Sequence, residues 1–67
     1  MEHMTMRQWR LARELTIEDM AKACDVHPNT YAAWEQDPGK VRVEAAFKIA
    51  QALGTTVDAI FFSHEAT

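Results

Sequence analysis

Residues 15–36 of the chain read LTIEDMAKACDVHPNTYAAWEQ, and this stretch predicts two short helices in close succession. Thr16 is a favourable N-cap, and Glu18 and Asp19 place negative charge in the first turn, where the helix dipole favours it. Leu15 before the cap and Met20 after it have the spacing of a hydrophobic staple. The first helix is therefore expected to begin after Thr16.

The same stretch predicts where the first helix ends and the second begins. Asp25 tolerates the left-handed backbone that ends a helix, although less readily than Gly or Asn. His27 can cap the next helix, and Pro28 suits its first position because an N–H group there would be unpaired. So short a connection forces adjacent helices to cross steeply, as in a helix-turn-helix, although any small helical bundle also has tight turns.

Three further helices are expected around this pair. They span about residues 5–14, 43–53 and 55–61, and the Asp-Pro-Gly-Lys run at 37–40 is a strong loop signal. Gly54 is a natural C-terminal cap. The predicted fold class is all-α, a compact bundle of five helices. The side chains expected to supply most of its core are Met20, Val26, Tyr31, Trp34 and Phe47.

The size and composition of the chain allow a single globular domain. Its 67 residues are 48% hydrophobic and 25% charged, and the lone Cys24 excludes an internal disulfide and a Cys-rich zinc site. The domain is expected over residues 4–62, with residues 1–3 as start or added residues and residues 63–67 as a C-terminal tail. No 18-residue apolar run or signal peptide is recognisable, so a cytoplasmic location is expected.

The net charge of −3 argues on its own against a nucleic-acid partner. The local distribution matters more than this sum, because salt screens charges beyond about 8 Å. Lys40 and Arg42 follow the second helix of the pair, whereas that helix itself contains no Lys or Arg.

A longer pattern joins these features to the C-terminal half. Its positions are Leu15-Thr16, Met20-Ala21, Asp25-Val26, Thr30, Trp34-Glu35, Phe47-Lys48-Ile49-Ala50, Ala52-Leu53-Gly54, Asp58 and Ile60. The pattern resembles the Cro/C1-type helix-turn-helix family, the lambda-repressor-like or XRE regulators, over about residues 5–62. The resemblance implies a phage or bacterial transcriptional regulator. Such a protein would bind double-stranded DNA as a homodimer and place the helix over residues 28–36 in the major groove.

The resemblance also implies a structural ion pair and shows three departures. Arg10 and Glu35 occupy positions where family members often pair the first helix with the end of the third. Ile17 stands where a Gln frequently contacts a phosphate, so only the backbone amides of the helix start can do so here. Asp25 and Glu14 stand where Gly is usual.

The residues expected to contact bases lie near the start of the helix over residues 28–36. Asn29 is the best candidate, because a side-chain amide pairs with adenine N6 and N7, unless it simply faces solvent. Thr30 either contacts DNA or turns its hydroxyl to the helix, and Ala32 and Ala33 either favour the helix or lie against a thymine methyl. The base-reading candidates are Pro28, Asn29, Thr30, Ala32 and Ala33.

The residues expected to contact phosphates flank that helix. Lys40 and Arg42 are the strongest of them, against the alternative of solvated loop charges, and His27 is either a contact or a neutral cap. The phosphate candidates are Thr16, Ile17, His27, Lys40 and Arg42.

The C-terminal apolar residues indicate a second subunit. Ile60, Phe61 and Phe62 exceed what one face of a short helix can hide, so they either fold back or form a dimer surface. We favour the homodimer, because family members commonly pair through this region.

Two other classes of function fit the sequence less well. The acidic balance and the uncharged helix over residues 28–36 suit a protein-interaction module on the same fold, such as an antitoxin-like or antirepressor subunit. An enzyme is not expected, because no nucleophile–base pair or Gly-rich phosphate loop is recognisable. No metal, cofactor or small-molecule ligand is expected, because His3, His27 and His64 lack ligand spacing.

Overall fold

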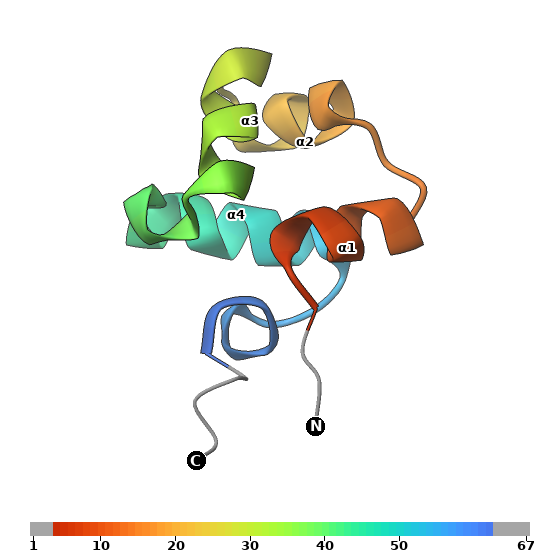
Figure 1. Ribbon diagram of the computed structural model, residues 1–67, viewed down its shortest axis with the longest axis vertical. Coiled ribbons are helices and arrows are strands. Elements are labelled where there is room, and N and C mark those ends of the chain that lie inside the picture. The colour runs from red at the N-terminus through yellow and green to blue at the C-terminus, as the bar shows by residue number, and fades with distance from the viewer. Residues whose placement is uncertain (1–3, 63–67) are drawn as a thin grey trace.

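The computed structural model describes residues 4–62, with the backbone alone described for Phe62. Its elements are α1 (Met6–Ala12), α2 (Ile17–Cys24), α3 (Pro28–Gln36), the 3-10 turn η1 (Pro38–Lys40), α4 (Val43–Leu53) and the π-type turn η2 (Asp58–Phe62) (Figure 1). The prediction of an all-α bundle is confirmed, and no strand occurs within residues 4–62. The first helix ends at Ala12 rather than at residue 14, and the last segment forms a wide turn instead of an α-helix.

Side chains next to the helix starts cap all three N-terminal helices. The Thr5 hydroxyl accepts from the Gln8 amide, and the Thr16 hydroxyl accepts from the Asp19 amide. In turn, the side-chain oxygens of Gln8 and Asp19 accept from the backbone N–H groups of the two threonines. The starts of α1 and α2 are therefore capping boxes. The His27 Nδ1 atom accepts from the Asn29 amide at 3.0 Å, as expected for a cap of α3.

Left-handed backbone occurs near the ends of α1, α2 and α4. Asp25 has φ 60° at the end of α2, and Glu14 has φ 59° two residues after α1. Gly54 ends α4 with φ 72°. The left-handed position of Asp25 confirms the predicted end of α2, and it turns the chain abruptly into α3.

The core gathers around α4. Its largest fully buried side chains are Tyr31, Met6, Met20, Ile49 and Leu53. Val26 and Trp34 pack against this cluster from partly buried positions. The prediction that Phe47 lies in the core is wrong, because its side chain is 62% exposed. The buried face of α4 runs through Ala46, Ile49, Ala50 and Leu53. Phe47 lies outside this face, because one residue along the helix turns it by about 100° from Ala46.

Two arginines of the N-terminal segment fasten α1 to distant parts of the chain. Arg10 forms the ion pair with Glu35 at the end of α3 and also donates to the Leu15 carbonyl at 3.0 Å. Arg13 donates to the Leu53 carbonyl at the end of α4 at 2.8 Å. The two contacts hold α1 against both α3 and α4.

No helix within residues 4–62 has the length and apolar character needed to cross a membrane.

Candidate nucleic-acid interface

Most of the sequence-predicted contact residues lie where α2 and α3 begin. Residues 25–27 separate the two helices, which pack against each other above α4 in Figure 1. Ala21 is buried and has no side chain beyond its Cβ, which permits a close approach of the helix backbones. The start of α3 is thereby held at the outside of the bundle.

All five base-reading candidates lie on the first two turns of α3 and are accessible in different degrees. Asn29 and Thr30 are exposed, and Pro28 and Ala32 are half-buried. The backbone amide of Asn29 is used by the His27 cap, while its side-chain amide bonds to no other residue in the described part of the chain. The Asn29 side chain thus offers both a donor and an acceptor to an external partner. Ala33, the fifth candidate, is exposed on the second turn of α3.

The start of α2 is less suited to a phosphate than the sequence suggested. The Asp19 carboxylate already accepts from the Thr16 amide at 2.9 Å, and these bonds lower the pKa of Asp19. Glu18 adds a second carboxylate in the same turn. Ile17 is half-buried, and its side chain has no polar group. Its contribution to an anion site is therefore limited to its backbone amide.

A groove of about 500 Å³ beside α3 collects three cations. Exposed Lys40 and Arg42, expected as phosphate contacts, line it together with Lys48 of α4. Thr30 of α3 lies on the same groove, next to the carboxylates of Asp25 and Glu44. Sequence reasoning missed Lys48 as a contact, although its spacing of three residues from Ala45 places both on one face of α4.

Buried Cys24 also borders this groove. Burial raises the pKa of the Cys24 thiol, and the positive charge of Lys48 offsets part of that rise. The thiol therefore stays protonated near neutral pH, and the groove contributes cations and a hydroxyl rather than a nucleophile.

The predicted dimer residues occupy different environments. Ile60 is buried in the core, and Phe61 is half-buried. The side chain of Phe62 lies outside the described residues. The structure therefore leaves Phe61 as the accessible member of this set within the described part of the chain.

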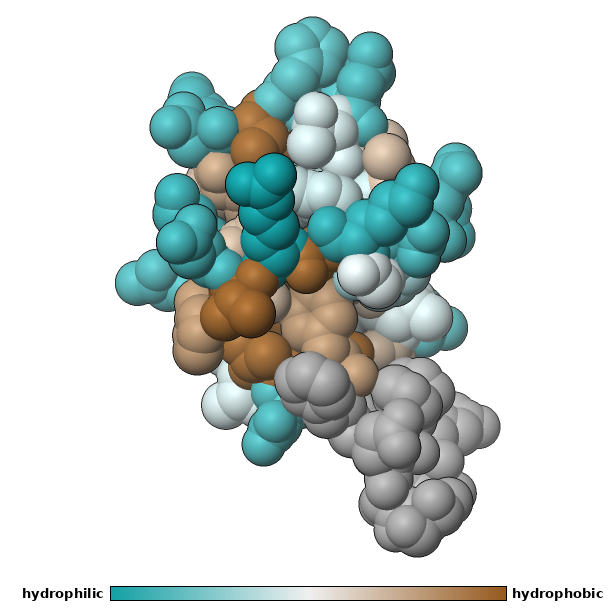
Figure 2. Space-filling model, turned by 90° about the vertical axis from the view of Figure 1, so that its left-hand side faces the viewer, coloured by the Kyte–Doolittle hydropathy of each residue, from teal (hydrophilic) through white to brown (hydrophobic). Residues whose placement is uncertain are grey.

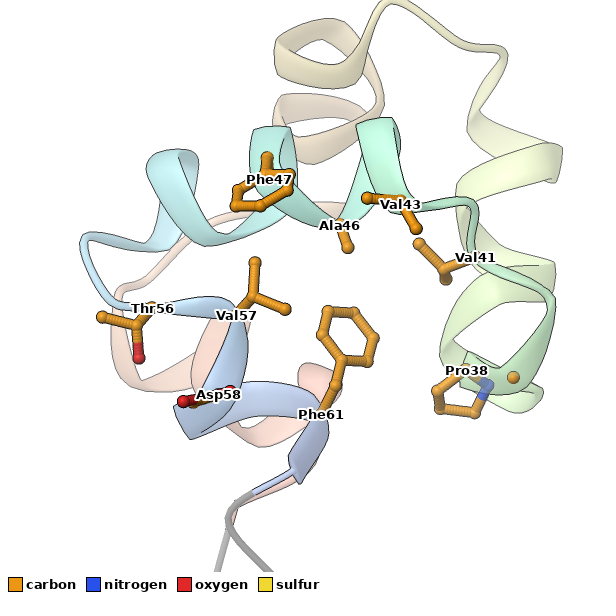
Figure 3. Close-up of a pocket in the computed structure, with 10 residues that line it drawn as sticks. Pro38, Val41, Val43, Ala46, Phe47, Thr56, Val57, Asp58 and Phe61 are labelled. Atoms are coloured by element: carbon orange, nitrogen blue, oxygen red, sulfur yellow. The ribbon is translucent and has the colours of Figure 1, made fainter.

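Phe61 lines an apolar pocket of about 930 Å³ between α4 and the C-terminal segment. Figure 3 shows Val57 and Phe61 directed toward α4, on the side of that helix away from α2. Val43 and Phe47 border the pocket with 71% and 62% of their surfaces exposed. Figure 2 views the molecule from the left-hand side of Figure 1. Apolar residues form a brown area in the lower half of that face, below mostly hydrophilic side chains. Sequence reasoning missed the contribution of α4 to this surface.

Within residues 4–62 no group of three or more His, Cys, Asp or Glu side chains is arranged to hold a metal ion. A family model described as helix-turn-helix matches residues 6–60, which include all four α-helices. No curated protein and no solved structure matches the chain closely enough to count as a relative.

Proposed function

From the premise that the chain belongs to the Cro/C1-type helix-turn-helix family, we propose that it is a cytoplasmic transcriptional regulator that recognises specific sequences of double-stranded DNA. The observation that carries the proposal is the exposed Asn29 side chain on the first turn of α3. The His27 cap fixes the backbone beneath it, and its amide group has no competing partner among the described residues. A side-chain amide on this fixed backbone can pair with an adenine edge through both its donor and its acceptor.

In this arrangement α3 lies in the major groove with its N-terminal turns toward the bases. Asn29 pairs with an adenine edge, and Thr30 and Ala33 contact neighbouring bases from the same helix. A second copy of α3 then reads a half-site one helical turn, about 34 Å, away.

Phosphate contacts come chiefly from the groove beside α3. Lys40, Arg42 and Lys48 line one hollow with Thr30, so a DNA strand that runs past it meets cations from η1, the following loop and α4. His27 adds a ring donor at the start of α3, because its Nδ1 accepts the cap bond and its Nε2 can donate. The acidic start of α2 contributes little to phosphate binding, because its carboxylates repel the phosphates of the DNA backbone.

The homodimer is part of the same proposal. Val43 and Phe47 leave an apolar surface beside the pocket around Phe61, and this surface lies on the side of α4 away from α2. A two-fold contact there buries both surfaces without covering α3, and it suits a palindromic operator.

Selection of bound duplexes from a random pool at low salt tests DNA recognition. We expect enrichment of a two-fold-symmetric site, and Asn29→Ala is expected to relax the preference at one position of each half-site by about 1–3 kcal/mol. The control is Gln36→Ala at the exposed end of α3, which should select the same site.

The alternative, a protein-interaction module, rests on the same apolar surface and on the absence of Lys and Arg from α3. Failure of the selection to enrich any sequence at low salt would favour this alternative and contradict the regulator.

Light scattering tests the dimer. Phe47→Ser is a sharper variant than a change at Phe61, because Phe47 is largely exposed whereas Phe61 packs against the core. We expect Phe47→Ser to lower the mass toward that of one chain while the far-ultraviolet circular dichroism stays unchanged. An unchanged dimer mass in a Val43→Ser, Phe47→Ser double variant would remove this surface from the proposal.

A further inference from the structure

A second groove lies at the start of the helix-turn-helix and differs in character from the cationic one. It encloses about 580 Å³ and is shallow, and its walls come from the end of α1, the start of α2 and the first two turns of α3. Most of its lining is apolar, and Leu11 at its edge is 50% exposed. The apolar residues that line it are Leu11, Leu15, Ile17, Pro28 and Ala32.

The charges at this groove exclude a phosphate as its occupant. Arg10 reaches the lining, but its guanidinium is bound to Glu35 and to the Leu15 carbonyl. Glu18 is the other charged residue of the lining, and its carboxylate repels anions. An occupant of this groove is therefore uncharged and largely apolar.

The groove is continuous with the surface that faces the bases. Asn29, Pro28 and Ala32 belong both to its lining and to the base-reading turns of α3. In the major groove of DNA the apolar group on the base edges is the C5 methyl of thymine. We propose that this groove receives the 5-methyl groups of one or two thymines in each half-site, an inference that rests on the proposed DNA binding.

Ile17 has a defined role in this arrangement. It occupies the first position of α2, and its partly buried side chain forms one wall of the groove opposite Ala32 and Pro28 of α3. Its branched side chain contacts a methyl group by dispersion. It cannot contact a phosphate as the Gln that is frequent at this position does. Recognition through adenine edges at Asn29 and thymine methyls beside it selects A·T pairs without cations on α3.

A deoxyuridine scan tests the inference on the duplex recovered by selection. Each thymine in turn is replaced by deoxyuridine, which pairs identically and lacks only the 5-methyl group, and the dissociation constant is measured at fixed salt. We expect one or two positions per half-site, under the start of α3, where the replacement weakens binding about fourfold, the effect of removing one buried methyl. Thymines outside the contacted bases should show no change.

A matched pair of variants assigns the effect to the groove. Ala32→Ser places a hydroxyl in the groove wall, and the deoxyuridine effect should fall below twofold in this variant. Ala23→Ser makes the same change at an exposed position of α2 outside the groove, and the fourfold effect should persist. Thermal melting followed by circular dichroism shows that both variants remain folded.

The outcomes separate this inference from the proposed function. A selected duplex whose thymine methyls are all dispensable would overturn the methyl recognition and leave DNA binding intact. A fourfold effect that persists equally in Ala32→Ser would place the methyl elsewhere and overturn the assignment to this groove. If no duplex binds, the proposed function fails and the inference fails with it.

Discussion

The Nε atom of Arg10 lies 2.6 Å from Oε2 of Glu35, and these side chains are only 8% and 7% exposed. Nη2 of the same guanidinium donates to Oε1 at 3.3 Å, so the contact is two-pronged, and the carboxylate raises the pKa of Arg10. The pair joins residues 25 positions apart and fixes the end of α3 against α1. It therefore controls the orientation of the helix that we place in the major groove.

Removal of one partner leaves the other charge buried. Glu35→Ala is expected to lower the free energy of unfolding by about 3–5 kcal/mol. That loss is a large part of the total free energy of unfolding, which is about 3–10 kcal/mol for a domain of this size. Urea denaturation measures it, with exposed Glu44→Ala as the control, for which at most about 1 kcal/mol is expected. Arg10→Met combined with Glu35→Leu should recover much of the loss, and a Glu35→Ala effect no larger than the control would show that the pair is unimportant.

Glycine at the two left-handed positions should stabilise the fold. Glu14 and Asp25 carry φ values near +60°, where an L-residue is strained by about 1–2 kcal/mol. Glycine removes that strain but gains freedom in the unfolded chain, so a net increase of up to about 1 kcal/mol is expected for Glu14→Gly and for Asp25→Gly. Lys22→Gly, inside α2, is the control and should lose about 1 kcal/mol. A lower urea midpoint for Asp25→Gly would contradict the left-handed conformation of that residue.

Acid should weaken the start of α2 before that of α1. The bonds to Thr16 lower the folded-state pKa of Asp19 below its ordinary 3.8, so its stabilisation is present above about pH 4 and is lost as the pH falls through the lowered pKa. In Asp19→Asn the urea midpoint should fall less steeply between pH 5 and pH 2 than in the parent chain. Gln8, which makes the same capping box without titrating, is the internal control: Gln8→Ala should lower the midpoint equally at every pH. Parallel acid profiles of the parent and Asp19→Asn would contradict the assignment.

DNA binding should depend only moderately on salt. If Lys40 and Arg42 each contact one phosphate, a dimer makes four such contacts, and the logarithm of affinity should fall with the logarithm of salt with a slope of about −3.6. Lys48 lies in the same groove, so Lys48→Gln decides whether it is a further contact: the slope becomes less steep by about 1.8 per dimer if it is. Exposed Lys22, which does not line the groove, supplies the control variant Lys22→Gln. A slope near −10 would contradict this placement of the phosphate contacts.

Local sequence was sufficient for the helix boundaries around α2 and α3. Thr16, His27 and Asp25 act on backbone groups within four residues of themselves, so their effect does not depend on how the bundle packs. The ends of α4 follow in the same way from Gly54 and the loop before it. The contact between Arg10 and Glu35 was foreseen only through the family resemblance, because nothing local relates residues 25 positions apart.

The tertiary structure alone decided which side chains face outward and which distant ones meet. The apolar repeat of α4 includes both Ala46 and Phe47, and only the packing of the bundle shows that Ala46 is buried while Phe47 is exposed. Packing likewise encloses Ile60. It brings Lys48 beside Lys40 and Arg42, and Ile17 beside Ala32. Helical periodicity determines the angle between neighbouring side chains, whereas the position of the other helices determines which angle is covered. For this protein the sequence therefore specified the helices and their caps, and the tertiary structure specified the cationic groove, the apolar groove and the apolar surface of α4.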